Sequence, residues 1–255
     1  MGERDPRVDP VRIALVTGGS RGIGRATVLA LARNGEPVGF CYASDEDGAN
    51  ETVRLADAEG QKVIAVRADV ADAKAVDRAF AEVEGQLGPV TVLVNNAGIT
   101  RDGLVARMSD DQWQSVIDTN LTGAFHTIRR ATKSMMKARY GRIVNVASVG
   151  GHMGNAGQAN YAAAKAGLLG LSRSVARELA PRGITCNVVA LGPIVTAMTD
   201  GMPDEWRARA EAVVPLGRFG TPEECAAVIS FLCSEAAGYV TGALVPVDGG
   251  MGMGH

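Results

Sequence analysis

Tyr161 and Lys165 have the residue types and the spacing that can carry out proton transfer. They stand four positions apart in an alanine-rich segment that favours a helix, so we expect both side chains on one helix face. A nearby ammonium group stabilises a phenolate and lowers the tyrosine pKa from its ordinary value of about 10. Tyr161 could therefore donate a proton in a reduction or accept one in an oxidation. Such a pair also arises by chance, so the prediction depends on further residues.

Ser148 and Asn120 could complete a catalytic site around this pair. Ser148 ends a predicted strand, and its hydroxyl could hold a substrate carbonyl oxygen near Tyr161. Asn120 lies inside a long helical pattern, where asparagine is unfavourable, so we expect it to distort the helix and to use its side chain. A water molecule held there could connect Lys165 to solvent.

A glycine-rich turn, Thr17–Gly24, joins the first predicted strand to a helix. Its glycines allow a tight turn and a close approach of a pyrophosphate, and the helix N-terminus offers free N–H groups. The spacing is G-x-x-x-G-x-G rather than the common G-x-G-x-x-G, and a plain strand-to-helix turn is the alternative interpretation. Its place after the first strand of a βαβ unit favours a dinucleotide site.

Polar residues also follow the third and fourth predicted strands. Asp69 could accept a hydrogen bond from an adenine amino group, and Asn95–Gly98 offers small residues beside an adenosine ribose. Each of these segments alone could simply form a turn, because Asn and Gly favour turns. Together they lie at the carboxyl ends of strands, where open α/β sheets bind ligands.

Short apolar runs alternate with longer amphipathic segments along the chain. Most runs are continuously apolar and rich in Val and Ile, as expected of strands buried on both faces. The alternation predicts an α/β fold, a Rossmann-type doubly wound parallel sheet of seven strands with helices on both faces. We expect a single domain over residues 11–255 after a loose tail over residues 1–10. The predicted strands are Arg12–Thr17, Pro37–Tyr42, Lys62–Arg67, Val90–Asn95, Arg142–Ala147, Thr185–Leu191 and Leu244–Val247, and the predicted helices cover about Gly24–Asn34, Ala71–Gln86, Asp110–Ala138 and Asn160–Leu179.

Composition narrows the class of protein further. The 255 residues are 46% hydrophobic and 21% charged with a net charge of −2, which is typical of a globular protein and offers no basic field for nucleic acid. The three histidines and four cysteines lack the spacing of a metal or redox site, so we expect no metal and buried free thiols. A signal peptide and a membrane span are not expected, which favours a cytoplasmic protein.

These motifs resemble, in order and spacing, those of the short-chain dehydrogenase/reductase family, from about Arg12 to the C-terminus. Within that family the chain looks most like the β-ketoacyl-acyl carrier protein reductases of fatty acid synthesis. The closer likeness rests on Asn95–Asp102, Gly157–Tyr161 and Gly249–Met253, and the last of these is similar to mycobacterial reductases that serve mycolic acid precursors. One departure is Leu191-Gly192-Pro193, where the family usually has Pro-Gly, and it bears on the shape of a substrate lid around residues 193–215.

The resemblance implies a mechanism and a cofactor. Hydride passes from the nicotinamide to a keto carbon while Tyr161 protonates the oxygen, Ser148 orients the carbonyl, Lys165 holds the ribose and Asn120 supports a water relay. NADPH is expected over NADH, because Tyr42 stands where an acidic residue would meet the ribose and Arg21 matches a basic residue that favours NADPH. The acidic residues Asp45 and Glu46 lie close to that position and count against this preference. The implied cofactor-binding residues are Gly18, Ser20, Arg21, Gly22, Ile23, Gly24, Asp69, Val70, Asn96, Ala97, Gly98, Tyr161, Lys165, Gly192, Ile194 and Thr196.

The resemblance also implies partners. The substrate would be a 3-oxoacyl group on acyl carrier protein or coenzyme A, and the chain would form a homo-oligomer, a tetramer by likeness, without nucleic acid or membrane. An acidic carrier needs a basic patch, for which Lys133, Lys137, Arg139, Arg142 and Arg182 are candidates, with Arg139 and Arg182 expected near the mouth of the cleft. Cations that complement helix C-termini are the alternative interpretation. Rival functions are a polyketide ketoreductase, an acetoacetyl-coenzyme A reductase, a small ketone, sugar or steroid dehydrogenase and, remotely, a catalytically inactive dinucleotide sensor.

Overall fold

Seven strands in the described part of the chain form one sheet in the order β3-β2-β1-β4-β5-β6-β7, and every neighbouring pair runs parallel. The computed structural model describes residues 12–196 and 204–253. The strand order reverses between β1 and β4, and such a switch point opens a crevice at the carboxyl ends of the strands. The predicted fold class is confirmed. The strands are β1 (Ile13–Thr17), β2 (Val38–Tyr42), β3 (Val63–Arg67), β4 (Val90–Asn95), β5 (Gly141–Ser148), β6 (Ile184–Leu191) and β7 (Leu244–Val247).

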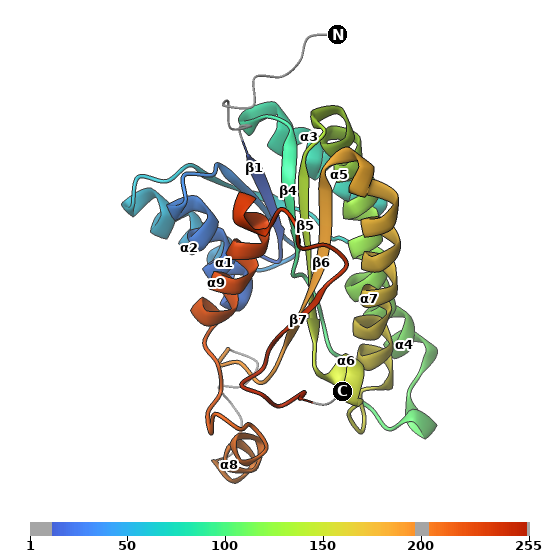
Figure 1. The fold of residues 1–255 in the computed structure, drawn as a ribbon. Coiled ribbons are helices and arrows are strands. Elements are labelled where there is room, and N and C mark those ends of the chain that lie inside the picture. Colours follow the sequence, from blue (N-terminus) through green and yellow to red (C-terminus); the bar gives the residue numbers. More distant parts are fainter. Residues whose placement is uncertain (1–11, 197–203, 254–255) are drawn as a thin grey trace.

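Helices cover both faces of this sheet, with α1, α2 and α9 on one face and α3, α5 and α7 on the other (Figure 1). Alternate residues of a strand serve opposite faces, so Ala14 and Val16 pack toward α1 and α9 while Ile13 and Leu15 pack toward α3. This two-sided burial explains the continuous apolar runs of the sequence. The longer helices are α1 (Gly22–Arg33), α2 (Glu46–Ala58), α3 (Ala73–Leu87), α4 (Asp110–Ile117), α5 (Gly123–Ala138), α7 (Ala159–Leu179), α8 (Asp204–Ala212) and α9 (Pro222–Cys233), and the short α6 is Gly150–Met153.

The long helix predicted over Asp110–Ala138 is interrupted at Asn120. Residues Asp118–Thr122 form a π-helical turn between α4 and α5, and Asn120 within it is buried. The predicted distortion at Asn120 is therefore confirmed. Wide turns of this kind redirect side chains and often occur at functional sites.

Two helices that the sequence analysis did not name begin with side-chain caps. Asp45 caps α2 by accepting a hydrogen bond from the Gly48 N–H, and Thr221 and Glu224 form a reciprocal capping box at the start of α9. The run Thr221-Pro222-Glu223-Glu224 is a signature of a helix start that the sequence offered. In contrast, the predicted N-terminal tail and residues 197–203 of the predicted lid lie outside the described residues. None of the helices described is long and apolar enough to cross a membrane.

Candidate active site

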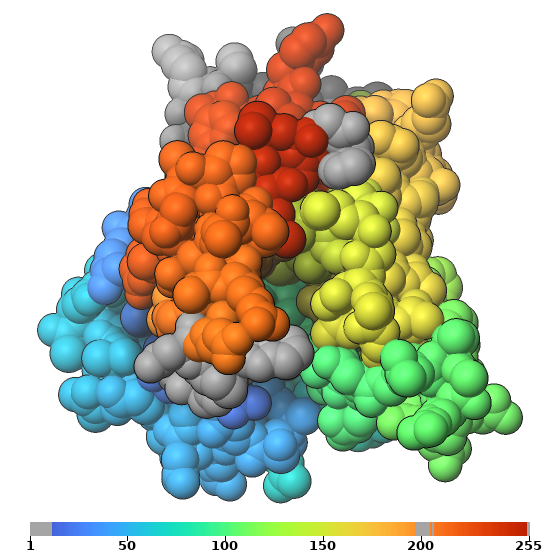
Figure 2. Space-filling view, turned by 90° about the horizontal axis from the view of Figure 1, so that it is seen from below, coloured from blue at the N-terminus to red at the C-terminus, as the bar shows by residue number. Residues whose placement is uncertain are grey.

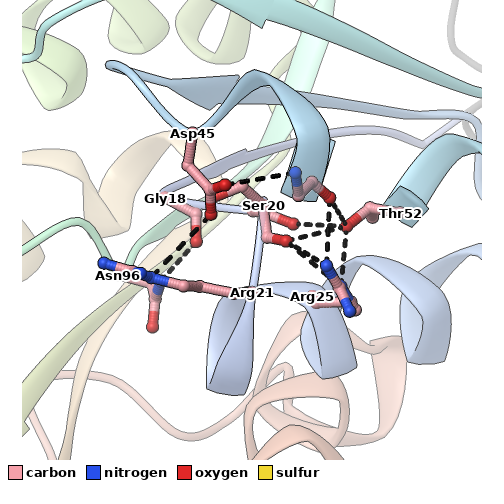
Figure 3. Close-up of polar contacts among 9 residues, drawn as sticks. Gly18, Ser20, Arg21, Arg25, Asp45, Thr52 and Asn96 are labelled. Atoms are coloured by element: carbon pink, nitrogen blue, oxygen red, sulfur yellow. Dashed lines mark hydrogen bonds and ion pairs between the residues drawn. The ribbon is translucent and has the colours of Figure 1, made fainter. Parts of the chain in front are cut away.

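The glycine turn between β1 and α1 can be made only by glycines. Gly18 and Gly22 have φ of +70° and +53°, and a Cβ on Gly24 would lie 1.9 Å from the Gly18 carbonyl oxygen. Asn96, after β4, fixes the turn from the side, because its Nδ2 donates to the carbonyl oxygens of Thr17 at 3.0 Å and Gly18 at 3.1 Å. Figure 3 shows the Asn96 side chain against Gly18. The structure thus brings the two predicted dinucleotide motifs together.

The loop after β4 is clamped between β1 and the π-helical turn. The N–H groups of Asn96 and Ala97 each donate to Thr17 Oγ1 at 3.0 Å. The Asn120 side chain accepts from the Ile99 N–H at 2.8 Å and donates to the Ile99 carbonyl at 3.0 Å. Asn120 therefore positions this loop, while its part in a water relay stays a prediction.

Ser148, Tyr161 and Lys165 meet where β5 ends against α7. Burial raises the pKa of Tyr161, and a hydrogen bond with the Ser148 hydroxyl opposes that rise, as the two hydroxyls are in contact. Lys165 Nζ lies 5.6 Å from the centre of the Tyr161 ring. The Ser148 Oγ also accepts a hydrogen bond from the Gly150 N–H at 3.2 Å, which fixes its position. The three residues predicted to be catalytic are thus neighbours.

The predicted lowering of the Tyr161 pKa is not found in this arrangement. The Tyr161 pKa is raised because burial disfavours the phenolate, and the Asp102 carboxylate adds to the rise. Lys165 is itself buried, its Nζ donates to the Val146 carbonyl at 2.8 Å, and burial lowers its pKa to about 8. A tyrosine that keeps its proton is the form that a reduction requires.

The other predicted cofactor residues gather at the same edge of the sheet. Asp69 is exposed after β3, where its Oδ1 accepts from the Ala71 N–H at 2.9 Å, and Val70 beside it is buried. Thr196 lies over the glycine turn, because a Cβ on Gly22 would approach its Cγ2 to 3.6 Å. Contacts of these residues with a cofactor remain predictions. The remaining predicted positions are Ser20 and Ile23 in the turn, and Gly192 and Ile194 after β6.

The departure at Leu191-Gly192-Pro193 is accommodated by the sheet. Leu191 is the buried last residue of β6, and its carbonyl accepts from the Val149 N–H at 2.9 Å. Gly192 is required because a Cβ there would lie 2.7 Å from Asp248 Cα, and the Pro193 carbonyl accepts from the Gly220 N–H at 3.0 Å. The start of the predicted lid is thus anchored to β7 and to the segment before α9.

A cavity of about 450 Å³ lies beside this anchored loop, lined by residues that include Pro193, Leu216, Pro246 and Met253. None of the four predicted catalytic residues lines it. Figure 2, which looks onto the carboxyl ends of the strands, shows a separate hollow between the orange segment that contains α8 and the yellow segment around α6. In the chain, Ser148 ends the strand before α6 and Tyr161 lies in the first turn of the helix after it.

A chain of hydrogen-bonded, buried side chains that was not predicted from the sequence lies beneath the site. Thr127 Oγ1 donates to Asn95 Oδ1 at 2.6 Å, Asn95 Nδ2 to Asn145 Oδ1 at 2.8 Å, and Asn145 Nδ2 to Ser172 Oγ at 2.7 Å. This network joins β4 and β5 to α5 and α7 and holds in place the helix that carries Tyr161 and Lys165. Asn95 and Asn145 inside apolar strands were the available signal, because buried polar groups need partners.

The predicted basic patch needs two corrections. Arg142 is 4% exposed and lies 3.2 Å from Glu235, so it belongs to the interior and not to a surface patch. Arg139 and Arg182 are exposed, but they precede β5 and β6, whereas Ser148 ends β5. The eight residues of β5 span roughly 26 Å. Within one chain these arginines therefore lie at the opposite end of the sheet from Ser148 and the other residues predicted to be catalytic.

Comparison with known proteins finds relatives over nearly the whole chain. The family described as enoyl-(acyl carrier protein) reductase matches residues 18–252. The 3-oxoacyl-(acyl-carrier-protein) reductase FabG of Staphylococcus aureus strain Mu50 is 50% identical over 240 residues, which cover 94% of this chain and 98% of the relative. The 3-oxoacyl-(acyl-carrier-protein) reductase MabA of Mycobacterium avium is 48% identical over 244 residues, which cover 96% and 91%. A crystal structure described as a putative gluconate dehydrogenase from Agrobacterium tumefaciens aligns with a TM-score of 0.91 and 37% identity, over 95% of this chain and 96% of the other.

The chain belongs to the short-chain dehydrogenase/reductase family. That membership confirms the predicted resemblance and makes the chain an oxidoreductase that acts on CH–OH and C=O groups. It also confirms the coarser part of the cofactor prediction, a nicotinamide dinucleotide.

Proposed function

We propose that the chain reduces a 3-oxoacyl thioester to the 3-hydroxyacyl thioester with NADPH, in fatty acid biosynthesis. The observation that carries the proposal is the meeting of Ser148, Tyr161 and Lys165 beside a glycine turn in a chain about half identical to 3-oxoacyl-(acyl-carrier-protein) reductases. A dinucleotide fits the residues present. Gly24 lets α1 begin close against Gly18, where a Cβ would collide, and a Cβ on Gly98 would come within 3.5 Å of Lys165 Nζ.

In this proposal each side chain has a separate task. The nicotinamide supplies the hydride when bound. Ser148 and Tyr161 direct their hydroxyls at the substrate carbonyl oxygen, and Tyr161 transfers its proton to that oxygen. Lys165 holds the ribose hydroxyls and carries a positive charge below its pKa of about 8. Asn120 keeps the loop after β4 against the turn. Arg21 carries the preference for NADPH.

A steady-state assay tests the substrate. We expect oxidation of NADPH with acetoacetyl thioesters of acyl carrier protein and of coenzyme A, and a lower kcat/KM with NADH. Gluconate and a simple ketone are the comparison substrates, because a putative gluconate dehydrogenase shares the fold at 37% identity. Turnover of gluconate with none of the thioesters would make the chain a sugar-acid dehydrogenase instead.

The proposal includes a homotetramer in the cytoplasm. Large apolar side chains are exposed along the segment from η1 (Val105–Arg107) to α5, including Val105 at 77%, Trp113 at 41% and Phe125 at 43%. Such a surface favours pairing with a second copy. The four free cysteines are buried, which suits a reducing compartment. Light scattering at micromolar concentration tests the assembly, and a stable monomer would contradict it.

A further inference from the structure

Arg25 ties the start of α2 to the glycine turn. Its Nη2 donates to the Ser20 carbonyl at 2.6 Å and to the Gly48 carbonyl at 3.1 Å, and its Nε donates to Thr52 Oγ1 at 3.0 Å. Thr52 Oγ1 in turn donates to the Gly19 carbonyl at 3.1 Å. Figure 3 shows this cluster from the side of α1. Arg25 is thereby occupied by protein groups, and the first turn of α2 is held beside the glycine turn.

Asp45 is the N-cap residue that precedes that first turn, and its side chain lies near Arg21. Its Oδ1 accepts from the Gly48 N–H at 3.1 Å as the cap of α2, and its Oδ2 lies 3.9 Å from Arg21 Nε. A Cβ on Gly48 would lie 2.5 Å from the Asp45 carboxylate, so the position of this carboxylate requires glycine at residue 48. The Asp45 side chain is 34% exposed, whereas that of Arg21 is 72% exposed. A fixed carboxylate therefore stands beside a cation that solvent and ligands can reach.

We propose that Asp45 is a specificity-determining residue that competes with the 2′-phosphate of NADPH for Arg21. Asp45 thereby reduces the preference of the protein for NADPH over NADH. The inference rests on the proposed function, in which Arg21 receives that phosphate. Asp45 follows β2 by three residues, and the end of this strand is where Rossmann folds read the ribose 2′ position. Two anionic groups then share one guanidinium, and the carboxylate must give up its partner when the phosphate binds.

The expected size of the effect follows from exposure. Ion pairs in contact with water contribute little and are screened by salt. Removal of the Asp45 charge should therefore tighten NADPH binding by about two- to fivefold and leave NADH binding unchanged.

Asp45→Asn isolates the charge, because asparagine caps helices as well as aspartate does. Asp47→Asn is the matched control, since Asp47 is an exposed acid of the same turn and forms no ion pair among the described residues. We would measure dissociation constants for NADPH and NADH by nucleotide fluorescence, without substrate. The proteins are wild type, both single variants, Arg21→Gln and the double variant of Arg21 and Asp45.

We expect Asp45→Asn to raise the affinity for NADPH alone and Asp47→Asn to leave both affinities unchanged. When Arg21 is replaced by glutamine, Asp45→Asn should no longer raise the affinity for NADPH. High salt should reduce the increase in affinity. The inference would be overturned if Asp45→Asn raised the affinity for both nucleotides equally, or if Asp47→Asn raised the affinity for NADPH as much. It would also be overturned if the increase persisted in the variant that lacks Arg21. NADPH binding to wild type with no effect of Asp45→Asn overturns the inference alone, whereas a wild type that binds neither nucleotide overturns the proposed function as well.

Discussion

The two ends of the same parallel sheet both bury an ionisable group, but in different surroundings. At the carboxyl end, Lys165 is 4% exposed and donates to the Val146 carbonyl, and burial lowers its pKa to about 8. At the amino end, Glu36 is 5% exposed and lies 3.1 Å from Arg12. Burial raises the pKa of Glu36 to about 7 despite the opposing charge of Arg12.

What differs is the set of groups around each. Lys165 lies near Gly98 and beside the hydroxyl pair of Ser148 and Tyr161. Glu36 is paired with Arg12, and Tyr140 lies near the same arginine, with its ring 4.4 Å from the Arg142 guanidinium. A perturbed pKa therefore marks a candidate site where other groups capable of proton transfer accompany it. We call the carboxyl end of the sheet, with Lys165, the chemical end and the amino end, with Glu36, the structural end. Substitutions at the two ends should change different properties of the protein.

Tyr161→Phe should have the largest effect, and only on chemistry. It removes the proton and keeps the ring, so turnover should fall by at least about 10²-fold. Dinucleotide affinity and the free energy of unfolding should stay near those of wild type. Tyr239→Phe is a suitable control, because Tyr239 is fully exposed. Near-normal turnover of purified Tyr161→Phe would remove Tyr161 from the mechanism.

Lys165→Met should weaken dinucleotide binding by roughly 10- to 100-fold below pH 8, the contribution of one hydrogen bond from a charged group. The wild-type ammonium loses its proton as pH rises through about 8, so wild-type affinity should decline through that pH toward the level of the variant. The variant itself should show no such decline. Lys133→Met, which removes an exposed lysine of α5, should follow the wild-type profile. A wild-type affinity that stays flat up to pH 10 would contradict the role given to the Lys165 charge.

Glu36→Gln should change stability and leave chemistry alone. The folded chain holds the Glu36 proton up to about pH 7, while the unfolded chain releases it near 4.5. The free energy of unfolding should therefore fall as pH rises from 4.5 to 7, by about 3 kcal/mol, and the variant should lack this decline. Urea unfolding across that pH range measures it, with Glu59→Gln at an exposed ion pair to Arg33 as control. Loss of turnover in Glu36→Gln at pH 7, with folding intact, would show that this end also contributes to catalysis.

Sequence predicted the chemical end better than the structural end, for a physical reason. Strands such as Arg12–Thr17, observed as β1 from Ile13, were found because burial on both faces leaves a continuous apolar run. The residues predicted to be catalytic could be named from the sequence because their motifs are local, and the structure brings Ser148, Tyr161 and Lys165 together. Arg142, in contrast, was assigned to the surface, since its partner Glu235 is 93 positions away and only the fold brings them together. The direction of the Tyr161 pKa was also wrong, because it depends on burial of Tyr161 in the fold, and the Lys165 ammonium donates to Val146 of another element.

The smallest effect concerns the surface of the amino end, where Arg139 and Arg182 form the exposed part of the predicted docking patch. Arg139 also donates to the Pro181 carbonyl at 3.4 Å, so the two arginines belong to one corner of the molecule. A carrier docked there lies at the far end of β5 from Ser148 of the same chain, and its acyl group would have to enter the cleft of a neighbouring copy.

Arg139→Glu combined with Arg182→Glu should then lower kcat/KM for carrier-bound substrate by about threefold at low salt and spare coenzyme A thioesters. High salt should shrink the difference because wild type weakens too. Equal activity of both proteins on the carrier-bound substrate at low salt would leave these arginines with the role that their position suggests, cations that complement the ends of helices.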